Sequence, residues 1–212
     1  MSPRLLHEGL PAALPAGEVL LWSGSPDWRV LARRVFHVRK LAVYFAAIAV
    51  FGGVSAADGG AAAAGLAFLK AAGFGAIPLV LAAIYSWMTA RGSIYSITNR
   101  RVVMHIGLAL PVTLNLPFER ITSADMRGAA DGSGDLSLTL AGSDRFAYAV
   151  LWPHARPWCL SPAQPTLRGL ADVAQAASTL ARALAAVTDR PAPALASVSP
   201  SPALAQHASL AA

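Results

Sequence analysis

Two long apolar stretches predict a pair of membrane-spanning helices. Residues 41–57 carry no charged side chain and would reach roughly 25 Å as a helix, just enough to cross the hydrocarbon of a bilayer. Residues 71–90 are also uncharged and would reach roughly 30 Å. Residues 58–70, between them, are rich in glycine and alanine and suit either a loop or an extension of the second helix.

After Arg91 the apolar period changes from that of a helix to two, which is typical of half-buried strands. Short runs such as "TNRR", "DGSG" and "GSD" separate the alternating stretches and predict turns. We therefore expect an antiparallel meander. Its apolar positions are Leu110, Val112, Leu114, Leu116 and Phe118, then Leu136, Leu138 and Leu140, then Phe146, Tyr148 and Val150.

An amphipathic helix is predicted after the strands, over residues 167–187. A further short strand is expected near the N-terminus, in "GEVLLWSGS". The fold class that follows is a membrane α-helical hairpin plus an α+β domain, in which a small antiparallel β-barrel or sheet is capped by the C-terminal helix. The apolar face of that helix is expected to contain Leu167, Leu170, Val173, Ala174, Ala177, Leu180, Leu184 and Val187.

A basic amphipathic helix is predicted immediately before the first span. Asp27 is suited to cap its N-terminus. The helix would have an apolar face of Trp28, Leu31, Val35 and Val38 and a basic stripe of Arg29, Arg33, His37 and Lys40. Such a helix either lies in the membrane surface or is simply a solvated helix ahead of a span. The pattern does not choose between the two.

These elements divide the chain into four parts. Residues 1–40 form an N-terminal segment with the basic helix, residues 41–90 the two-helix hairpin, and residues 91–189 the β-domain with its C-terminal helix. Residues 190–212 are rich in proline, alanine and serine and predict a disordered tail.

Composition and charge support a membrane protein and suggest its orientation. Hydrophobic residues make up 55% of the chain and charged ones 13%, about half of what a soluble domain carries. The net charge of +6 is concentrated beside the spans, with candidate membrane-surface residues Arg29, Arg33, Arg34, Arg39 and Lys40. The positive-inside rule then predicts that both termini lie in the cytoplasm. Anionic lipids, and not nucleic acid, are the expected partners of this charge.

The sequence contains no motif typical of catalysis or metal binding, so we expect neither an enzyme nor a resident cofactor. Cys159 is expected to be a packed residue. None of the histidines falls inside a predicted span, which argues against ligation of a pigment or haem there. Transient contact with bacteriochlorophyll through apolar surface stays open.

Two surfaces are candidates for binding a partner. The first is the cluster of Trp152, His154, Arg156 and Trp158, because aromatic and arginine residues are enriched in binding hot spots. The tryptophans would otherwise pack under the C-terminal helix. The second comprises the small-residue stretches "FGGVSAA" and "AAGFGA", which permit close helix approach, either to a partner or within the hairpin.

Two stretches, "YSITNRRVVMHIG" and "LPFERI", resemble the pleckstrin-homology-like (PH-like) domain of small bacterial membrane proteins. Three more particular segments, "LWSGSPDWRVLARRVFHVRKLAVYF", "ITNRRVVMHIGLALPVTLNLPF" and "VLWPHARPW", resemble the PuhB family of photosynthetic complex assembly proteins in purple bacteria. The resemblance covers roughly residues 14–187.

This resemblance implies a function that composition alone does not. It suggests an assembly factor for the photosynthetic reaction centre and its light-harvesting 1 antenna, acting by binding their polypeptides at the inner membrane and able to self-associate. The family has no assigned catalytic residues. The alternative is a generic membrane-anchored PH-like module that binds lipid or protein without a link to photosynthesis. Which client is bound, and in what oligomeric state, is not encoded in these motifs.

Overall fold

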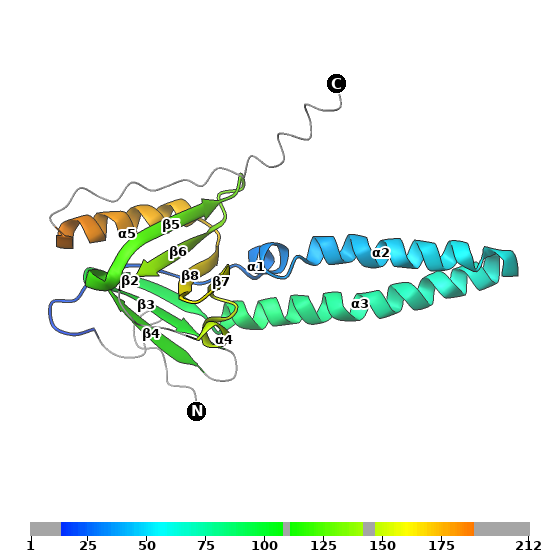
Figure 1. Cartoon of the computed structure of the whole chain (residues 1–212), viewed down its shortest axis with the longest axis horizontal. Coiled ribbons are helices and arrows are strands. Elements are labelled where there is room, and N and C mark those ends of the chain that lie inside the picture. The colour runs from blue at the N-terminus through cyan, green and yellow to red at the C-terminus, as the bar shows by residue number, and fades with distance from the viewer. Residues whose placement is uncertain (1–13, 108–110, 142–146, 189–212) are drawn as a thin grey trace, which may run out of the picture.

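A β-domain with a long helical hairpin projecting from one end is the main feature of the computed structural model (Figure 1). The structure describes residues 14–107, 111–141 and 147–188. The predicted disordered tail, residues 190–212, lies outside the described residues. So do Leu110 and Phe146, two of the predicted strand positions.

The hairpin consists of α2 (Val38–Ser55), a short turn η1 (Ala57–Gly59) and α3 (Ala61–Arg91). Residues 61–70 therefore extend the second helix, and the loop is short. Both helices are long and apolar enough to cross a membrane, and most of their large apolar side chains face outward. Gly75 lies against Phe45, where a Cβ atom would come within 2.7 Å of the phenylalanine side chain. Some of the small residues thus serve the packing of α2 on α3.

The first sheet has the order β1-β2-β3-β4, with all neighbours antiparallel. Its strands are β1 (Leu20–Gly24), β2 (Ile94–Thr98), β3 (Arg101–Ile106) and β4 (Val112–Pro117). Strand β1 precedes the hairpin and β2 follows it. The β-domain is therefore assembled from both sides of the hairpin, and the N-terminal segment is not a separate unit.

The second sheet has the order β5-β6-β8-β7, so it is not the simple meander that the sequence predicted. A short 3-10 turn, η2 (Phe118–Arg120), leads from the first sheet into it. Its strands are β5 (Ile121–Gly128), β6 (Gly134–Leu140), β7 (Ala155–Leu160) and β8 (Ala163–Leu170). Strand β8 lies between β6 and β7, whereas in a meander each strand would pair with the next one in the sequence.

Two predicted elements in this region are wrong. Tyr148 and Val150 do not alternate in a strand but belong to a single helical turn, α4 (Tyr148–Leu151), which ends as Trp152 turns extended before Pro153. Leu167 and Leu170 are strand residues of β8, and the last helix, α5, runs only from Val173–Thr188. Asp172 accepts a hydrogen bond from the Gln175 amide at the start of α5, so the helix begins there.

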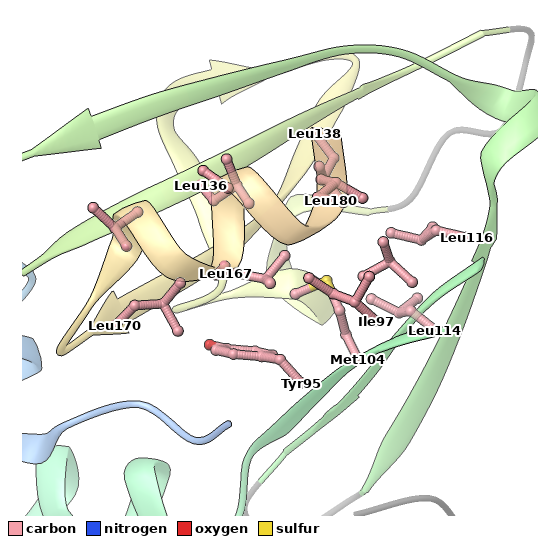
Figure 2. Close-up of a cluster of buried hydrophobic side chains, with 14 of the residues drawn as sticks. Tyr95, Ile97, Met104, Leu114, Leu116, Leu136, Leu138, Leu167, Leu170 and Leu180 are labelled. Carbon is pink, nitrogen blue, oxygen red and sulfur yellow. The ribbon is translucent and has the colours of Figure 1, made fainter. Parts of the chain in front are cut away.

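The core lies between the two sheets and α5 (Figure 2). Leu114, Leu116, Leu136 and Leu138 are all buried, as predicted, and β4 alternates with the exposed Asn115. In β6 the intervening Asp135 and Ser137 are buried too, so the alternation predicted for that strand is not seen. Helix α5 contributes Val173, Ala177, Leu180 and Leu184 as predicted, but Ala174 and Val187 face solvent, while Ala176 and Ala183 are buried. The predicted fold class, an α+β domain with a membrane hairpin, is confirmed.

The predicted basic helix over residues 27–40 is broken into two. Helix α1 (Trp28–Arg34) is capped by Asp27 as expected, but the chain turns at His37, whose φ of 51° is left-handed, and α2 begins at Val38. The break lets α1 and α2 run in different directions and make different contacts. Leu31 of α1 is fully buried where α1 packs on α3 and β8, whereas α2 must align with α3.

Candidate functional site at the base of the hairpin

The four residues of the predicted binding cluster have very different surroundings. Trp158 is 95% exposed, whereas His154 is only 1% exposed and lies inside the domain. Trp152 is 46% exposed, and its ring packs on Tyr85 of α3 and edge-on against Phe36. His154 therefore cannot contact a partner directly. Trp152 does not pack under α5 but links the β-domain to the hairpin.

Arg156 is held within the second sheet. Its Nη1 donates to Asp125 Oδ2 at 2.8 Å and to Gln164 Oε1 at 3.0 Å. Gln164 lies on the neighbouring strand β8, whereas Asp125 lies on β5, the other edge strand of this sheet, so the guanidinium connects β7 to both. Trp158 is thus the one member of the cluster that is wholly available to a partner.

Strand β7 is irregular where it carries Trp158. It pairs with β8 at Ala155 and again at Leu160, with a register shift between them. Trp158 lies in this bulge at φ 65°, a backbone region that bulky residues rarely occupy. Bulges re-aim side chains, and here the indole points away from the sheet. Backbone strain of this kind costs about 1–3 kcal/mol and is concentrated at functional sites in proteins.

His154 joins the β-domain to the end of α3 through a buried hydrogen-bond network. Its Nδ1 lies 2.6 Å from the Tyr95 hydroxyl and its Nε2 lies 3.1 Å from Ser93 Oγ. The Tyr95 hydroxyl accepts from the Arg168 amide at 3.2 Å, and its own proton has two acceptors, the Arg168 carbonyl at 3.4 Å and Nδ1 at 2.6 Å, of which the shorter contact to Nδ1 is favoured. A neutral imidazole then carries its proton on Nε2 and donates to Ser93. Burial lowers the pKa of His154 to about 3, with the Arg168 charge acting in the same direction.

Arg168 and Asp135 extend this network toward α1. Asp135 Oδ2 lies 3.9 Å from an amino nitrogen of Arg168 and equally far from one of Arg34. Asp135 Oδ1 accepts from the Gly169 amide at 2.9 Å. Burial lowers the pKa of Arg168, and Asp135 opposes that shift. The Nε atom of Arg168 is buried and has no hydrogen-bond partner among the described residues.

A cleft of about 620 Å³ opens beside this network, between the β-domain and the start of α2. Trp158, Trp152 and Leu160 line one part of it, and Val35 and His37 lie where the chain enters the first span. Its charged side chains are Arg34, Arg127, Asp135 and Arg168. The cleft is therefore basic and aromatic, and it lies at the end of the domain that the hairpin leaves.

The predicted membrane-surface residues divide into two groups. Arg33 pairs with Asp131 at 3.5 Å, and Arg34 donates to the backbone carbonyls of Ser133 and Arg127, so both hold α1 against the β5–β6 hairpin. Their structural role was not foreseen from the sequence. The other group is exposed around the hairpin base and consists of Arg29, Arg39 and Lys40. A role for the five residues at the membrane surface stays a prediction.

Tryptophan–arginine pairs flank the hairpin base on its other side. The Arg91 guanidinium lies 4.6 Å from the Trp87 ring centroid, and that of Arg29 lies 5.2 Å from the Trp28 ring centroid. Aromatic and basic side chains of this kind favour the headgroup level of a bilayer. Among the described residues, no group of three or more His, Cys, Asp or Glu side chains could hold a metal ion.

Little in the amino-acid pattern points to the buried network. Arg168 lies in "LRGL", which reads as the start of a helix, and Tyr95 reads as one apolar strand position among several. The available signal is Gly169, whose φ of 70° and close approach to Leu31 mark the point where α1 lies on β8. A single glycine in a leucine-rich stretch does not reveal that approach.

Comparison with known proteins identifies the family. The family model described as Bacterial PH domain matches residues 34–184, which include the hairpin and nearly all of the β-domain. The chain belongs to the bacterial PH domain family. A relative from Rhodobacter capsulatus, named "Uncharacterized 23.7 kDa protein in puhA 5'region", is 35% identical over 189 residues. The match covers 86% of this PH-domain chain and 87% of the relative. No solved structure matches it significantly.

Proposed function

We propose that this PH-domain protein is an assembly factor for the photosynthetic reaction centre and its light-harvesting 1 antenna, which holds client polypeptides where they meet the membrane. The observation that carries the proposal is Trp158, wholly exposed on the bulge of β7 beside the hairpin base. A rigid exposed indole is a strong anchor for a partner. A strained backbone at that position is consistent with a binding role rather than with packing.

The link to photosynthesis is supported by the relative and by sequence. The Rhodobacter capsulatus relative is named for the 5' region of puhA, a photosynthesis gene. The segments "FHVRKLAVYF" and "WPHARPW" resemble the PuhB family, and they include both the start of α2 and the bulge that carries Trp158. Both observations favour this link, whereas the PH domain alone would suit a generic module equally well.

The charge around the hairpin supports an inner-membrane protein with its β-domain and both termini in the cytoplasm. Arg29, Arg39, Lys40 and Arg91 surround the base of the hairpin, whereas its other half carries only Lys70, offset by Asp58 in the turn. The positive-inside rule places the base on the cytoplasmic side. Client helices would then contact the apolar outer face of the hairpin while their cytoplasmic ends reach Trp158.

Deletion of the gene in its phototrophic host tests this function. A factor that acts by binding lowers the yield of its product without stopping a reaction. Absorbance of the assembled reaction centre and light-harvesting 1 antenna should therefore fall, while bacteriochlorophyll synthesis continues. Unchanged absorbance in the deletion strain would leave the generic membrane-anchored module as the better explanation.

Complementation separates the binding surface from the rest of the protein. A Trp158→Ala variant should fold, because the indole has no packing to lose, yet it should restore complex yield poorly. The matched control is Leu21→Ala on β1, another exposed apolar side chain, which lies away from the hairpin base and should restore yield fully. Full rescue by Trp158→Ala would show that clients bind elsewhere.

A further inference from the structure

We propose that the cleft at the hairpin base binds the phosphate of an anionic phospholipid headgroup, held by Arg34, Arg127 and Arg168. The cleft shares Trp158 with the proposed client surface, but the groups that would hold the phosphate are the three arginines, so the site would operate whatever client the protein assists. It places a specific lipid molecule against the junction of the β-domain and the hairpin.

The charges in the cleft are unbalanced in favour of an anion. Asp135 is the carboxylate among the cleft's lining residues, and it is shared at 3.9 Å between Arg34 and Arg168. Arg127 has no acidic partner within 4 Å among the residues that the structure describes. The neighbouring carboxylates are already engaged, Asp131 by Arg33 and Asp125 by Arg156. A phosphate would supply the missing negative charge.

Arg168 provides a second observation that points to a ligand. Its side chain is only 8% exposed, and within the part of the chain that the structure describes its Nε atom has no hydrogen-bond partner. One of its amino groups donates to the Pro153 carbonyl at 3.3 Å, and the other faces Asp135 at a loose 3.9 Å. A buried guanidinium with unfilled donors is costly to the fold. Arginine forks match phosphate oxygens, so a bound headgroup would relieve that cost.

The position of the cleft favours a lipid over a free anion or a peptide. Val35 and His37 line it, and the first span begins at the next residue, Val38. Trp152, also in the lining, packs on Tyr85 of α3. Trp158 and Leu160 are exposed at the same place, as side chains at a membrane interface are. A headgroup in the cleft would therefore leave its acyl chains running beside α2 and α3.

Native mass spectrometry of the full-length protein in detergent, titrated with phosphatidylglycerol, tests the site. Arg127→Gln removes an exposed cation without an ion pair, so the variant should fold, and it should retain the lipid about fivefold more weakly. Arg91→Gln is the matched control. It removes the same charge at the same end of the hairpin but outside the cleft, and its lipid retention should match the wild type.

Each other outcome overturns the proposal. Equal weakening by Arg127→Gln and Arg91→Gln would mean diffuse surface attraction, with no built site. Displacement of phosphatidylglycerol by millimolar inorganic phosphate would assign the cleft to a free anion. Absence of lipid retention, with Arg127→Gln lowering capture of client polypeptides from cells, would make the cleft a protein-binding surface.

Discussion

His154 gives the contact between the β-domain and the hairpin a pH dependence. Its pKa is about 3 in the folded chain because burial disfavours the imidazolium. In the unfolded chain the imidazole has its ordinary pKa of about 6.5. Since the folded pKa is the lower one, the unfolded chain binds more protons below pH 6.5. Folding stability is therefore complete above about pH 6.5 and falls as the pH drops toward 3.

We expect the unfolding free energy of the purified protein to decrease by about 2 kcal/mol between pH 6.5 and pH 5. Thermal unfolding in detergent, followed by near-ultraviolet circular dichroism, would show this as a falling Tm. His154→Asn keeps a donor and an acceptor but does not titrate, so its Tm should be flat over the same range. Glu18 and Asp131 have lowered pKa values and act only at more acid pH. An equal slope in both proteins would exclude His154 as the cause.

Gly169 holds α1 against β8, and its replacement should separate them. Its φ is 70°, and an added Cβ atom would lie 2.9 Å from the Leu31 side chain. Gly169→Ala should cost about 1–2 kcal/mol in backbone strain and a further 1–3 kcal/mol in overpacking. Gly132→Ala, at φ 77° with only ordinary contact nearby, pays the backbone cost alone. Similar Tm values for the two variants would show that the Leu31 side chain moves aside without a measurable loss of stability.

At the scale of elements, the small residues of the hairpin are of two kinds, those at the contact between α2 and α3 and those on its outer face. Gly75 lies against Phe45, whereas Gly73 has nothing within 4 Å of an added Cβ atom. Both glycines lie in the same stretch, "AAGFGA", which permits close approach of helices. The two positions therefore distinguish the two interpretations of that stretch.

Valine substitutions at these positions should have different effects. Gly75→Val should force α2 and α3 apart and lower the amount of protein in the membrane. Gly73→Val should leave the protein level unchanged, because the side chain points into open space. If client helices also use this face, Gly73→Val will still reduce assembled antenna absorbance. Normal antenna absorbance with Gly73→Val would confine client contact to other surfaces.

The sequence predicted correctly those elements in which one apolar period corresponds to one helix or strand packed against the core. Strand β4 turns one face to the core, so Leu114 and Leu116 alternate with the exposed Asn115, and Leu136 and Leu138 of β6 are buried as their spacing predicted. The predictions were wrong where one apolar period continues across two elements. Leu167 and Leu170 fit a helical spacing with Val173, yet both belong to strand β8, which pairs with β6 and β7. Long-range pairing of this kind leaves no local signal.

The candidate site was only partly predictable for the same reason. The cluster of aromatic and basic residues near position 156 was visible in sequence, but which member faces outward depends on the bulge in β7. Neither the burial of His154 nor its contact with Ser93 follows from spacing, because their separation along the chain is large. The pairing of Arg34 with Asp135 is equally non-local.

At the scale of the whole molecule, the hairpin is attached to the β-domain through the elements on either side of it. The chain enters the hairpin from α1, which packs on α3 and β8, and leaves it directly into β2. A motion of the hairpin relative to the β-domain would break these contacts. The hairpin is thus held in one orientation relative to the β-domain (Figure 1).

The orientation of the hairpin in the membrane is a prediction of the charge distribution. A periplasm-active reporter inserted at Gly59, in the turn between α2 and α3, should be active. The same reporter fused after Val187, at the end of α5, should be silent. The reverse pattern would place the β-domain in the periplasm and would contradict assembly from the cytoplasmic face.

Photo-crosslinking in growing phototrophic cells tests the central claim, that Trp158 meets client polypeptides, most directly. A photoreactive amino acid at position 158 should capture antenna or reaction-centre polypeptides. The same group at position 187, an exposed site on α5 away from the hairpin base, should capture none of them. Capture of these polypeptides at 158 alone is the predicted result. Equal capture at both positions, or none at 158 from a protein present at normal levels, would contradict the account.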